Sequence, residues 1–218
     1  EGAGTVDTYT TVNSLGSQNA AIYATGSGTT INNYGNINFT SGVGNVGVYS
    51  DNGAIANNHG NITVAGSDVD NDLYSIGMAT IGGTIKNYNT INVTGDYGLG
   101  MFAQGVGSYA ENNGTINITG SAKNGYGMYL DAGAKGVNNG IIRANGTGSE
   151  AIGIAVLDGS EFTNNGIVDI NLANSTGVYV RNAIIKNYGT INIAGTGSVG
   201  VKSSSGIYED PSGNQSAI

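Results

Sequence analysis

A seven-residue motif that returns at a nearly constant interval limits the folds open to this chain. The motif starts with Asn, has Gly two residues later in six of its seven copies, and continues as a short apolar alternation. The copies read NYGNINF, NHGNITV, NYNTINV, NNGTINI, NNGIIRA, NNGIVDI and NYGTINI. Neighbouring copies are 23 to 29 residues apart. This period is typical of solenoid proteins, in which similar coils stack along one axis.

A second motif lies 10 to 12 residues before each copy of the first. It reads AIY, GVY, GMA, GMF, GMY, GIA and GVY, and GVK begins an eighth unit. Both motifs alternate with a period of two, which indicates β-strands. In TINIT, for example, Ile116 and Ile118 face one side of the strand while Asn117 faces the other. No stretch of ten or more residues has a helical period, and abundant Gly disfavours helix.

One such unit cannot bury its own apolar side, but stacked units spaced about 4.8 Å apart can. We therefore predict an all-β fold, a right-handed parallel β-helix of about eight coils of ~25 residues. The whole of 1–218 forms a single β-helix domain, with repeats over 21–202. Residues 1–20 are expected to be irregular or a partial N-terminal coil, and 203–218 an irregular C-terminal end. The core column is expected to contain Ile37, Ile62, Ile91, Ile116 and Ile191.

Two other solenoids have a related period. A leucine-rich repeat needs several Leu in each unit, whereas this chain has few. A left-handed β-helix shows hexapeptide repeats, and none occur here. The right-handed β-helix is therefore the favoured fold.

The recurring Asn predicts a ladder of side-chain amides in which each amide bonds to its neighbour in the next coil. Its members are Asn33, Asn58, Asn87, Asn112, Asn138, Asn164 and Asn187. The Gly two residues later is expected to have a positive φ; these are Gly35, Gly60, Gly114, Gly140, Gly166 and Gly189. Asn89 takes this place in the third copy, and Asn also tolerates a positive φ. His59, the only histidine, occupies the slot between Asn and Gly and is expected to stack at the turn.

Several kinds of chemistry are excluded by composition. The chain has no Cys and one His, so Ser-His-Asp and Cys-His catalysis cannot be assembled. Asp51 and Asp131 fall at equivalent turns about three coils apart, roughly 14 Å, which is too far for the carboxylate pair of a glycosidase. With Asp158 they are expected to form Asx turns beside glycines. We predict no catalytic residue, no enzymatic activity and no cofactor.

The charge balance and hydropathy restrict the partners. The net charge is −8, with seven Lys and Arg residues placed singly, which argues against nucleic acid and anionic membranes. No apolar run reaches the ~18 residues that a membrane helix needs. We therefore expect no direct membrane insertion by this segment. Exposed strand edges at the two ends allow weak end-to-end contacts, and we expect a monomer.

The segment with Asp68, Asp70 and Asp72 carries the densest charge and falls in the longest repeat. Alternating carboxylates are a weak calcium candidate. The EF-hand pattern fails, however, because Leu73 replaces its Gly and Ala79 its bidentate Glu. A solvated loop that protrudes from the rod is the favoured interpretation, and no metal site is predicted.

An aromatic column is the candidate ligand-binding site. The residue after the inward apolar position of the second motif is expected to point outward, beside an outward Gly. The aromatic members are Tyr23, Tyr49, Phe102, Tyr129 and Tyr179. Exposed aromatic rows can bind sugars or proteins. The alternative is that these rings only pack on one another and stabilise the sheet.

Over residues 20–202, the units, which follow the pattern GVGxYxxxGxxxxNNGTINVTG, resemble the passenger repeats of classical (type Va) autotransporters. The resemblance is to the large fusobacterial outer-membrane adhesins in particular. It implies a secretory signal upstream, a membrane anchor downstream and display on the extracellular side of the bacterial outer membrane. It also implies attachment to a host cell-surface protein or glycan, or to other bacteria, without enzymatic chemistry. Two alternatives stay open: a passive structural stalk that displays a distal binding domain, and a polysaccharide-acting β-helix enzyme.

Overall fold

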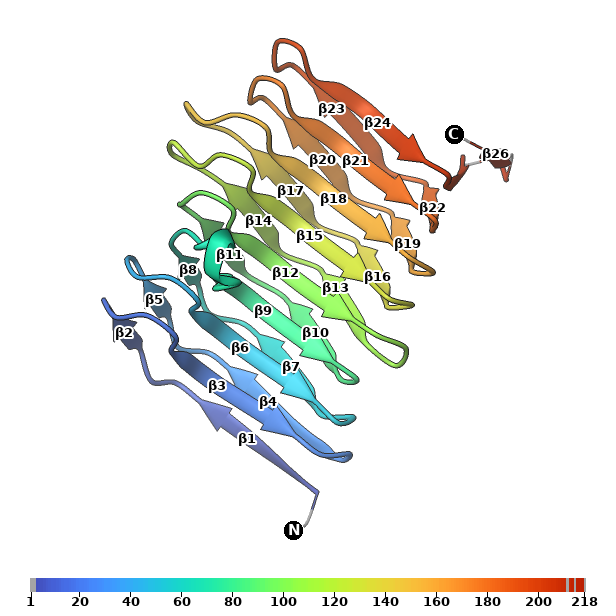
Figure 1. Cartoon of the computed structure of the whole chain (residues 1–218). Helices are drawn as coiled ribbons and strands as arrows, with labels where there is room; N and C mark the ends of the chain where they lie inside the picture. The colour runs from blue at the N-terminus through green and yellow to red at the C-terminus, as the bar shows by residue number, and fades with distance from the viewer. Residues whose placement is uncertain (1–2, 211, 214, 218) are drawn as a thin grey trace.

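The chain coils into a right-handed parallel β-helix, as the sequence predicts. The computed structural model describes residues 3–210, 212–213 and 215–217. Strands from successive coils lie side by side along the axis and form three long sheets (Figure 1). Within the described part of the chain, coils with all three strands run from β3–β5 to β21–β23, and partial coils flank them.

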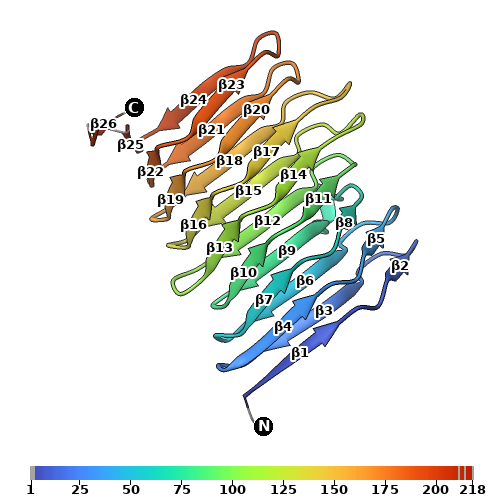
Figure 2. The same cartoon turned by 180° about the vertical axis from the view of Figure 1, so that it is seen from behind.

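Each coil contributes one strand to each sheet. Sheet 1 contains six-residue strands: β3 (Ala20–Thr25), β6 (Val46–Asp51), β9 (Ile76–Ile81), β12 (Leu99–Gln104), β15 (Tyr126–Asp131), β18 (Ile152–Leu157), β21 (Thr176–Arg181) and β24 (Val199–Ser204). Sheet 2 contains β1 (Gly4–Thr8), β4 (Thr29–Asn33), β7 (Ile55–Asn58), β10 (Thr84–Asn87), β13 (Tyr109–Asn112), β16 (Lys135–Asn138), β19 (Glu161–Asn164), β22 (Ile184–Asn187), β25 (Ile207–Glu209) and β26 (Gln215–Ala217). Sheet 3 contains β2 (Val12–Ser14), β5 (Ile37–Phe39), β8 (Ile62–Val64), β11 (Thr90–Val93), β14 (Thr115–Ile118), β17 (Ile141–Ala144), β20 (Ile167–Ile170) and β23 (Thr190–Ile193). Figure 2 shows sheets 2 and 3 from behind.

The core is a narrow aliphatic column enclosed by the three sheets. Ile37, Ile62, Ile91 and Ile116 are fully buried and lie on successive strands of sheet 3 in register. Ile191, near the C-terminal end, is half-buried and packs against the same cluster. Burying each such side chain contributes roughly 1.5–3 kcal/mol. The stacked side chains thus give a charge-poor chain a continuous core.

The buried Asn residues form a ladder that links the coils from Asn33 to Asn187. Each Nδ2 donates to the Oδ1 of the next Asn along the chain at 2.7 to 3.0 Å. Each Nδ2 also donates to the backbone carbonyl two residues later, as Asn58 does to Gly60. The ladder starts at Asn33 because Thr8 holds the equivalent place in β1. Within the described part of the chain, the Oδ1 of Asn33 consequently has no hydrogen-bond partner.

The glycines that follow the ladder do not have a positive φ, so that prediction is wrong for Gly35, Gly60, Gly114, Gly140, Gly166 and Gly189. They are required because the coils approach closely there. A Cβ on Gly60 would collide with the carbonyl of Gly35, because the Asn33 carbonyl accepts N–H groups from both His59 and Gly60.

Asn89, in the equivalent place of the third coil, also lacks a positive φ. Here the Asn58 carbonyl accepts from the Tyr88 N–H. The Asn89 N–H turns instead to Oδ1 of Asn87, and its side chain donates to the His59 carbonyl. This local change of hydrogen bonding accommodates a side chain where the other coils have Gly.

Strict alternation fails in sheet 1. Gly47 and Val48 are consecutive and both buried, and the strand pairing passes over the glycine. A Cβ on Gly47 would lie 2.9 Å from the Ile62 side chain and 2.5 Å from the Gly77 carbonyl oxygen. The glycine therefore faces the core, and the prediction of an outward Gly is wrong. Because of this break, Val46 and Tyr49 both lie on the outer face.

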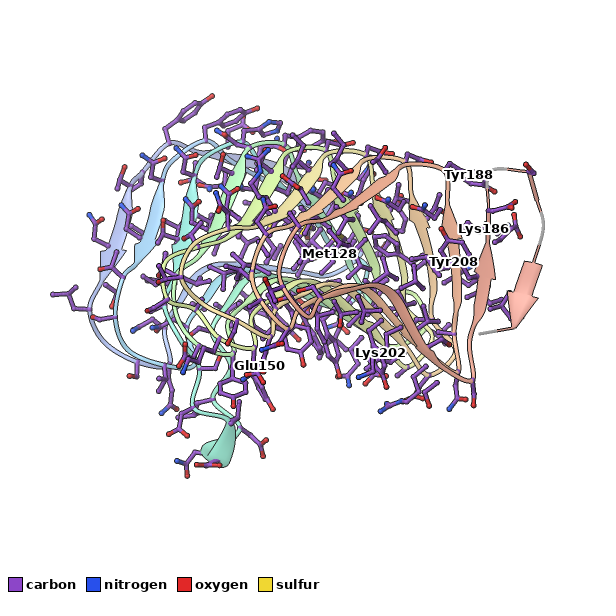
Figure 3. The ribbon with its side chains drawn as sticks, turned by 90° about the horizontal axis from the view of Figure 1, so that it is seen from above. Met128, Glu150, Lys186, Tyr188, Lys202 and Tyr208 are labelled. Atoms are coloured by element: carbon purple, nitrogen blue, oxygen red, sulfur yellow. The ribbon has the colours of Figure 1, made fainter. Side chains whose placement is uncertain are left out.

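The two ends and one loop depart from the regular coil. β1 and β2 form the partial N-terminal coil, whereas β25 continues the solenoid through residues expected to be irregular, with β26 antiparallel beside it. The longest repeat contains η1 (Val69–Asn71), a short 3-10 turn on a loop that stands out from the rod on the side of Glu150 (Figure 3). Among the described residues, no helix has the length and apolar character needed to cross a membrane.

Candidate binding groove on the outer face of sheet 1

The three outer faces of the rod differ in chemistry. The outer face of sheet 2 carries ion pairs between coils, such as Lys86–Glu111 at 3.3 Å and Lys135–Glu161 at 3.4 Å. Sheet 3 carries Arg143–Asp169 at 3.3 Å and a bond from Asn117 to Asn92. Sheet 1 instead has a second apolar cluster on its outer face. Its members are Ile76, Ala79 and Leu99, with Val46, Tyr49, Phe102, Tyr126 and Tyr129 packed against them.

A groove of about 470 Å³ lies over this cluster, a volume within the usual range of small-molecule sites. Ile76 and Leu99 form its floor at the starts of β9 and β12, and Gln104 and Asp131 lie at the strand ends. Val69 of the η1 loop and Tyr74, which follows this loop, also line the groove. The 29-residue repeat thus supplies a wall that the other coils lack.

Aromatic rings provide most of the remaining lining. Tyr126 and Tyr129 meet edge to face, with centroids 5.3 Å apart at 79°, and the Phe102 ring lies 5.8 Å from Tyr129. Burial, together with the nearby Asp131 carboxylate, raises the pKa of Tyr129 to about 12. Burial also raises the pKa of Tyr126, with smaller effects from Tyr74 and Tyr97. The hydroxyls of Tyr126 and Tyr129 therefore stay neutral and can donate hydrogen bonds at any physiological pH.

Among the residues that the structure describes, no Lys or Arg lines the groove, and Asp131 is the one charged lining residue. Arg181, whose charge reaches Tyr129, is held in an ion pair with Asp158. A ligand in this groove therefore meets apolar surface, phenol hydroxyls, an amide and one carboxylate.

The structure divides the predicted aromatic column. All five residues, Tyr23, Tyr49, Phe102, Tyr129 and Tyr179, occupy one row of sheet 1. Ala79 and Ala155 interrupt this row. Tyr23 and Tyr49 stack at 5.5 Å on the N-terminal side, and of the five only Phe102 and Tyr129 line the groove. Whether the row binds a ligand stays a prediction.

Three aromatic lining residues, Tyr74, Tyr97 and Tyr126, were not predicted from the sequence. Tyr126 occupies a position that is Leu or Ile in the neighbouring coils, so its aromatic side chain was a detectable signal. Tyr74 and Tyr97 lie between strands, outside the repeating positions. Nothing in the periodicity placed them beside the aromatic row.

The calcium candidates and His59 are not among the residues that line this groove. Among the residues that the structure describes, no three His, Asp or Glu side chains converge to hold a metal. Asp68 instead accepts a bond from Asn71, and Asp72 adopts a left-handed backbone. His59 stacks between Tyr34 and Tyr88 at 4.8 Å from each ring.

The two turn carboxylates lie far apart. Asp51 and Asp131 occupy the same row of sheet 1 but are separated by the strands β9 and β12. Asp51 accepts a bond from the Tyr23 hydroxyl at 2.9 Å. They do not form a pair that could flank a scissile bond.

Comparison with known protein families gives a match over the first two thirds of the chain. The family model described as the BigA third pectate lyase-like domain matches residues 1–140. No curated protein and no solved structure matches the chain.

Proposed function

Since the chain belongs to the family of the BigA third pectate lyase-like domain, we propose that it is an adhesive module of a bacterial surface protein. It attaches the cell to a host cell-surface protein or glycan, or to other bacteria. We further propose that its parent is an autotransporter of the fusobacterial type, which displays this segment outside the outer membrane. The resemblance of its repeats to such passengers supports this part of the proposal.

The observation that carries the proposal is the apolar outer face of sheet 1. A β-helix needs inward apolar side chains for its core, but its fold does not require outward ones. The outer faces of sheets 2 and 3 carry ion pairs between coils, beside single exposed apolar side chains such as Ile55 and Ile167. A shallower pocket of about 360 Å³ on sheet 2 is flanked by Lys135 and Glu161. Sheet 1 instead presents a packed cluster of apolar and aromatic side chains with a groove over it. Such patches on a soluble surface are typical of interaction sites.

We also propose that the module has no catalytic activity. Support comes from the separation of Asp51 and Asp131 and from the placement of His59 inside a ring stack. The aromatic rings and hydroxyls of the sheet 1 groove are suited to recognise a ligand by its shape and hydrogen bonds, without bond cleavage.

The test is attachment of the purified, fluorescently labelled chain to epithelial cells and to other bacteria. Tyr49→Ala and Tyr129→Ala should reduce attachment. The control is Tyr34→Ala, which removes an exposed ring at the edge between sheets 2 and 3 and should leave attachment unchanged. If all variants attach as the wild type does, sheet 1 is not the adhesive face. If the wild-type chain attaches to nothing, the passive stalk is the better function.

A further inference from the structure

We infer that the groove on sheet 1 binds a neutral sugar, one or two pyranose rings long, and discriminates against acidic sugars. This inference rests on the proposed function and names its ligand. Three observations support it: the aromatic lining, the free hydroxyls and the charge of the groove.

The first observation is the combination of ring faces and edges. A pyranose has an apolar face of C–H groups and a rim of hydroxyls. Phe102, Tyr126 and Tyr129 present rings at different angles around one groove. Aromatic contacts of this kind contribute about 0.5–1.5 kcal/mol each beyond the area that they bury. A flat sugar face fits such rings better than a flexible aliphatic chain does.

The second observation is hydrogen-bonding capacity without internal partners. Within the part of the chain that the structure describes, the hydroxyls of Tyr74, Tyr97, Tyr126 and Tyr129 make no hydrogen bond to protein. By contrast, Tyr23 bonds to Asp51 and Tyr188 to Glu209. Tyr126 and Tyr129 are half-buried, whereas Tyr74 and Tyr97 are exposed at the groove rim. Half-buried hydroxyls gain most from a ligand that supplies both donors and acceptors. Sugar hydroxyls do both, whereas a purely apolar ligand would leave these groups unsatisfied.

The third observation is charge. A uronic or sialic acid brings a carboxylate, and a buried carboxylate needs a cation or several N–H donors. Among the described residues, the lining offers no cation and only one N–H donor group, the Gln104 amide. Its charged residue is Asp131, and the nearby Arg181 is paired with Asp158. The net charge of −8 adds repulsion at longer range. Polygalacturonate, an acidic polysaccharide, is therefore a poor ligand for this site.

The experiment is a glycan array that carries neutral oligosaccharides of glucose, galactose, mannose, N-acetylglucosamine and N-acetylgalactosamine beside sialylated, sulfated and galacturonate oligosaccharides. Affinities of the hits are then measured by calorimetry. We expect neutral glycans to bind at least tenfold more tightly than acidic ones. Tyr126→Ala should weaken binding about tenfold, as the loss of a contact of about 1.4 kcal/mol would. Tyr129→Phe keeps the ring and should weaken it roughly fivefold.

The matched control is Tyr34→Phe, which removes an exposed hydroxyl outside the groove and should leave glycan affinity unchanged. Unfolding midpoints of all variants verify that the fold is retained. Preferential binding of acidic glycans, binding of no neutral glycan, or equal affinities for wild type and groove variants would each overturn the inference.

Attachment to cells separates this inference from the function on which it rests. If the groove variants lose attachment but no neutral glycan competes, adhesion stands and the sugar inference falls. If the wild-type chain attaches to no cell but binds neutral glycans through the groove, the sugar inference stands and the adhesive function falls.

Discussion

Replacing one rung of the Asn ladder tests how far buried amides stabilise this rod. Asn112 is fully buried; its Oδ1 accepts from Asn87 at 2.9 Å and its Nδ2 donates to Asn138 at 2.8 Å. Asn112→Leu keeps a similar volume but leaves a donor on Asn87 and an acceptor on Asn138 without partners. Each stranded buried group costs about 1–3 kcal/mol. We expect the free energy of unfolding to fall by roughly 2–6 kcal/mol.

The assay is urea unfolding followed by circular dichroism, with slopes compared to verify that the same surface is exposed. The matched control is Asn117→Leu. Asn117 also makes an amide hydrogen bond between coils, donating at 3.1 Å to Asn92 of the preceding coil, but it lies half-buried on the outer face of sheet 3. Water can replace that bond, so the control should lose about 1 kcal/mol or less. Equal losses in the two variants would refute the reasoning, since burial would then add nothing to the bond.

Three further predictions concern the ladder start, the coil contacts and the groove. Thr8→Asn should supply a donor to the unpaired Oδ1 of Asn33. A gain of about 1 kcal/mol would raise the unfolding temperature by roughly 2–4 °C; a lower unfolding temperature in scanning calorimetry would contradict this. Gly140→Ala should lower the urea midpoint strongly because its Cβ meets the carbonyl of Gly114, whereas Gly4→Ala, with open space around it, should not; similar midpoints would disprove the close-approach account. Burial raises the pKa of Tyr129 to about 12. The stability that comes from its neutral form is therefore fully present below the unfolded pKa of about 10 and is lost as pH rises through about 12. In a spectrophotometric pH titration, the tyrosinate absorbance that appears at the highest pH should be missing in Tyr129→Phe.

The regular part of the fold could be predicted because it repeats. The spacing of Asn33, Asn58 and Asn87 determines which residues lie above one another, and the alternation in sheet 3 determines which Ile is inside. Both the stacking order and the inward side of the strand follow from comparing one strand with the equivalent strand of the next coil. A single sequence with internal repeats contains that information several times over.

The sequence alone does not show why a given position requires Gly, because either a close backbone approach or a positive φ can be the reason. Gly60 is needed for close approach of the backbone, while Gly53 has a φ of 82°; the letter is the same in both cases. Asn89 favoured the wrong cause because Asn also tolerates a positive φ. The alternation in sheet 1 was misread for a related reason, since Gly47 has no side chain to reveal that it faces inward.

The groove was only partly predictable because it depends on contacts between a loop and a sheet. Phe102 and Tyr129 follow the repeat, and their row was identified from it. Tyr74 belongs to the irregular loop of the longest repeat, whose path over β9 and β12 depends on packing. Position in the repeat therefore predicts the platform of the candidate site but not its wall.

The Asn ladder is directional: each interior rung donates to the Asn of the coil on its C-terminal side and accepts from the Asn of the coil on its N-terminal side. When a gene gains or loses one whole repeat unit, the Asn donor of one coil still meets the Asn acceptor of the next. The core Ile of one coil likewise still packs on the Ile of the next. Such an event changes the length of the rod by a fixed step of about 4.8 Å. An insertion of half a unit would instead place polar side chains in the core. The length of such a rod can thus evolve in discrete increments, without any new packing solution.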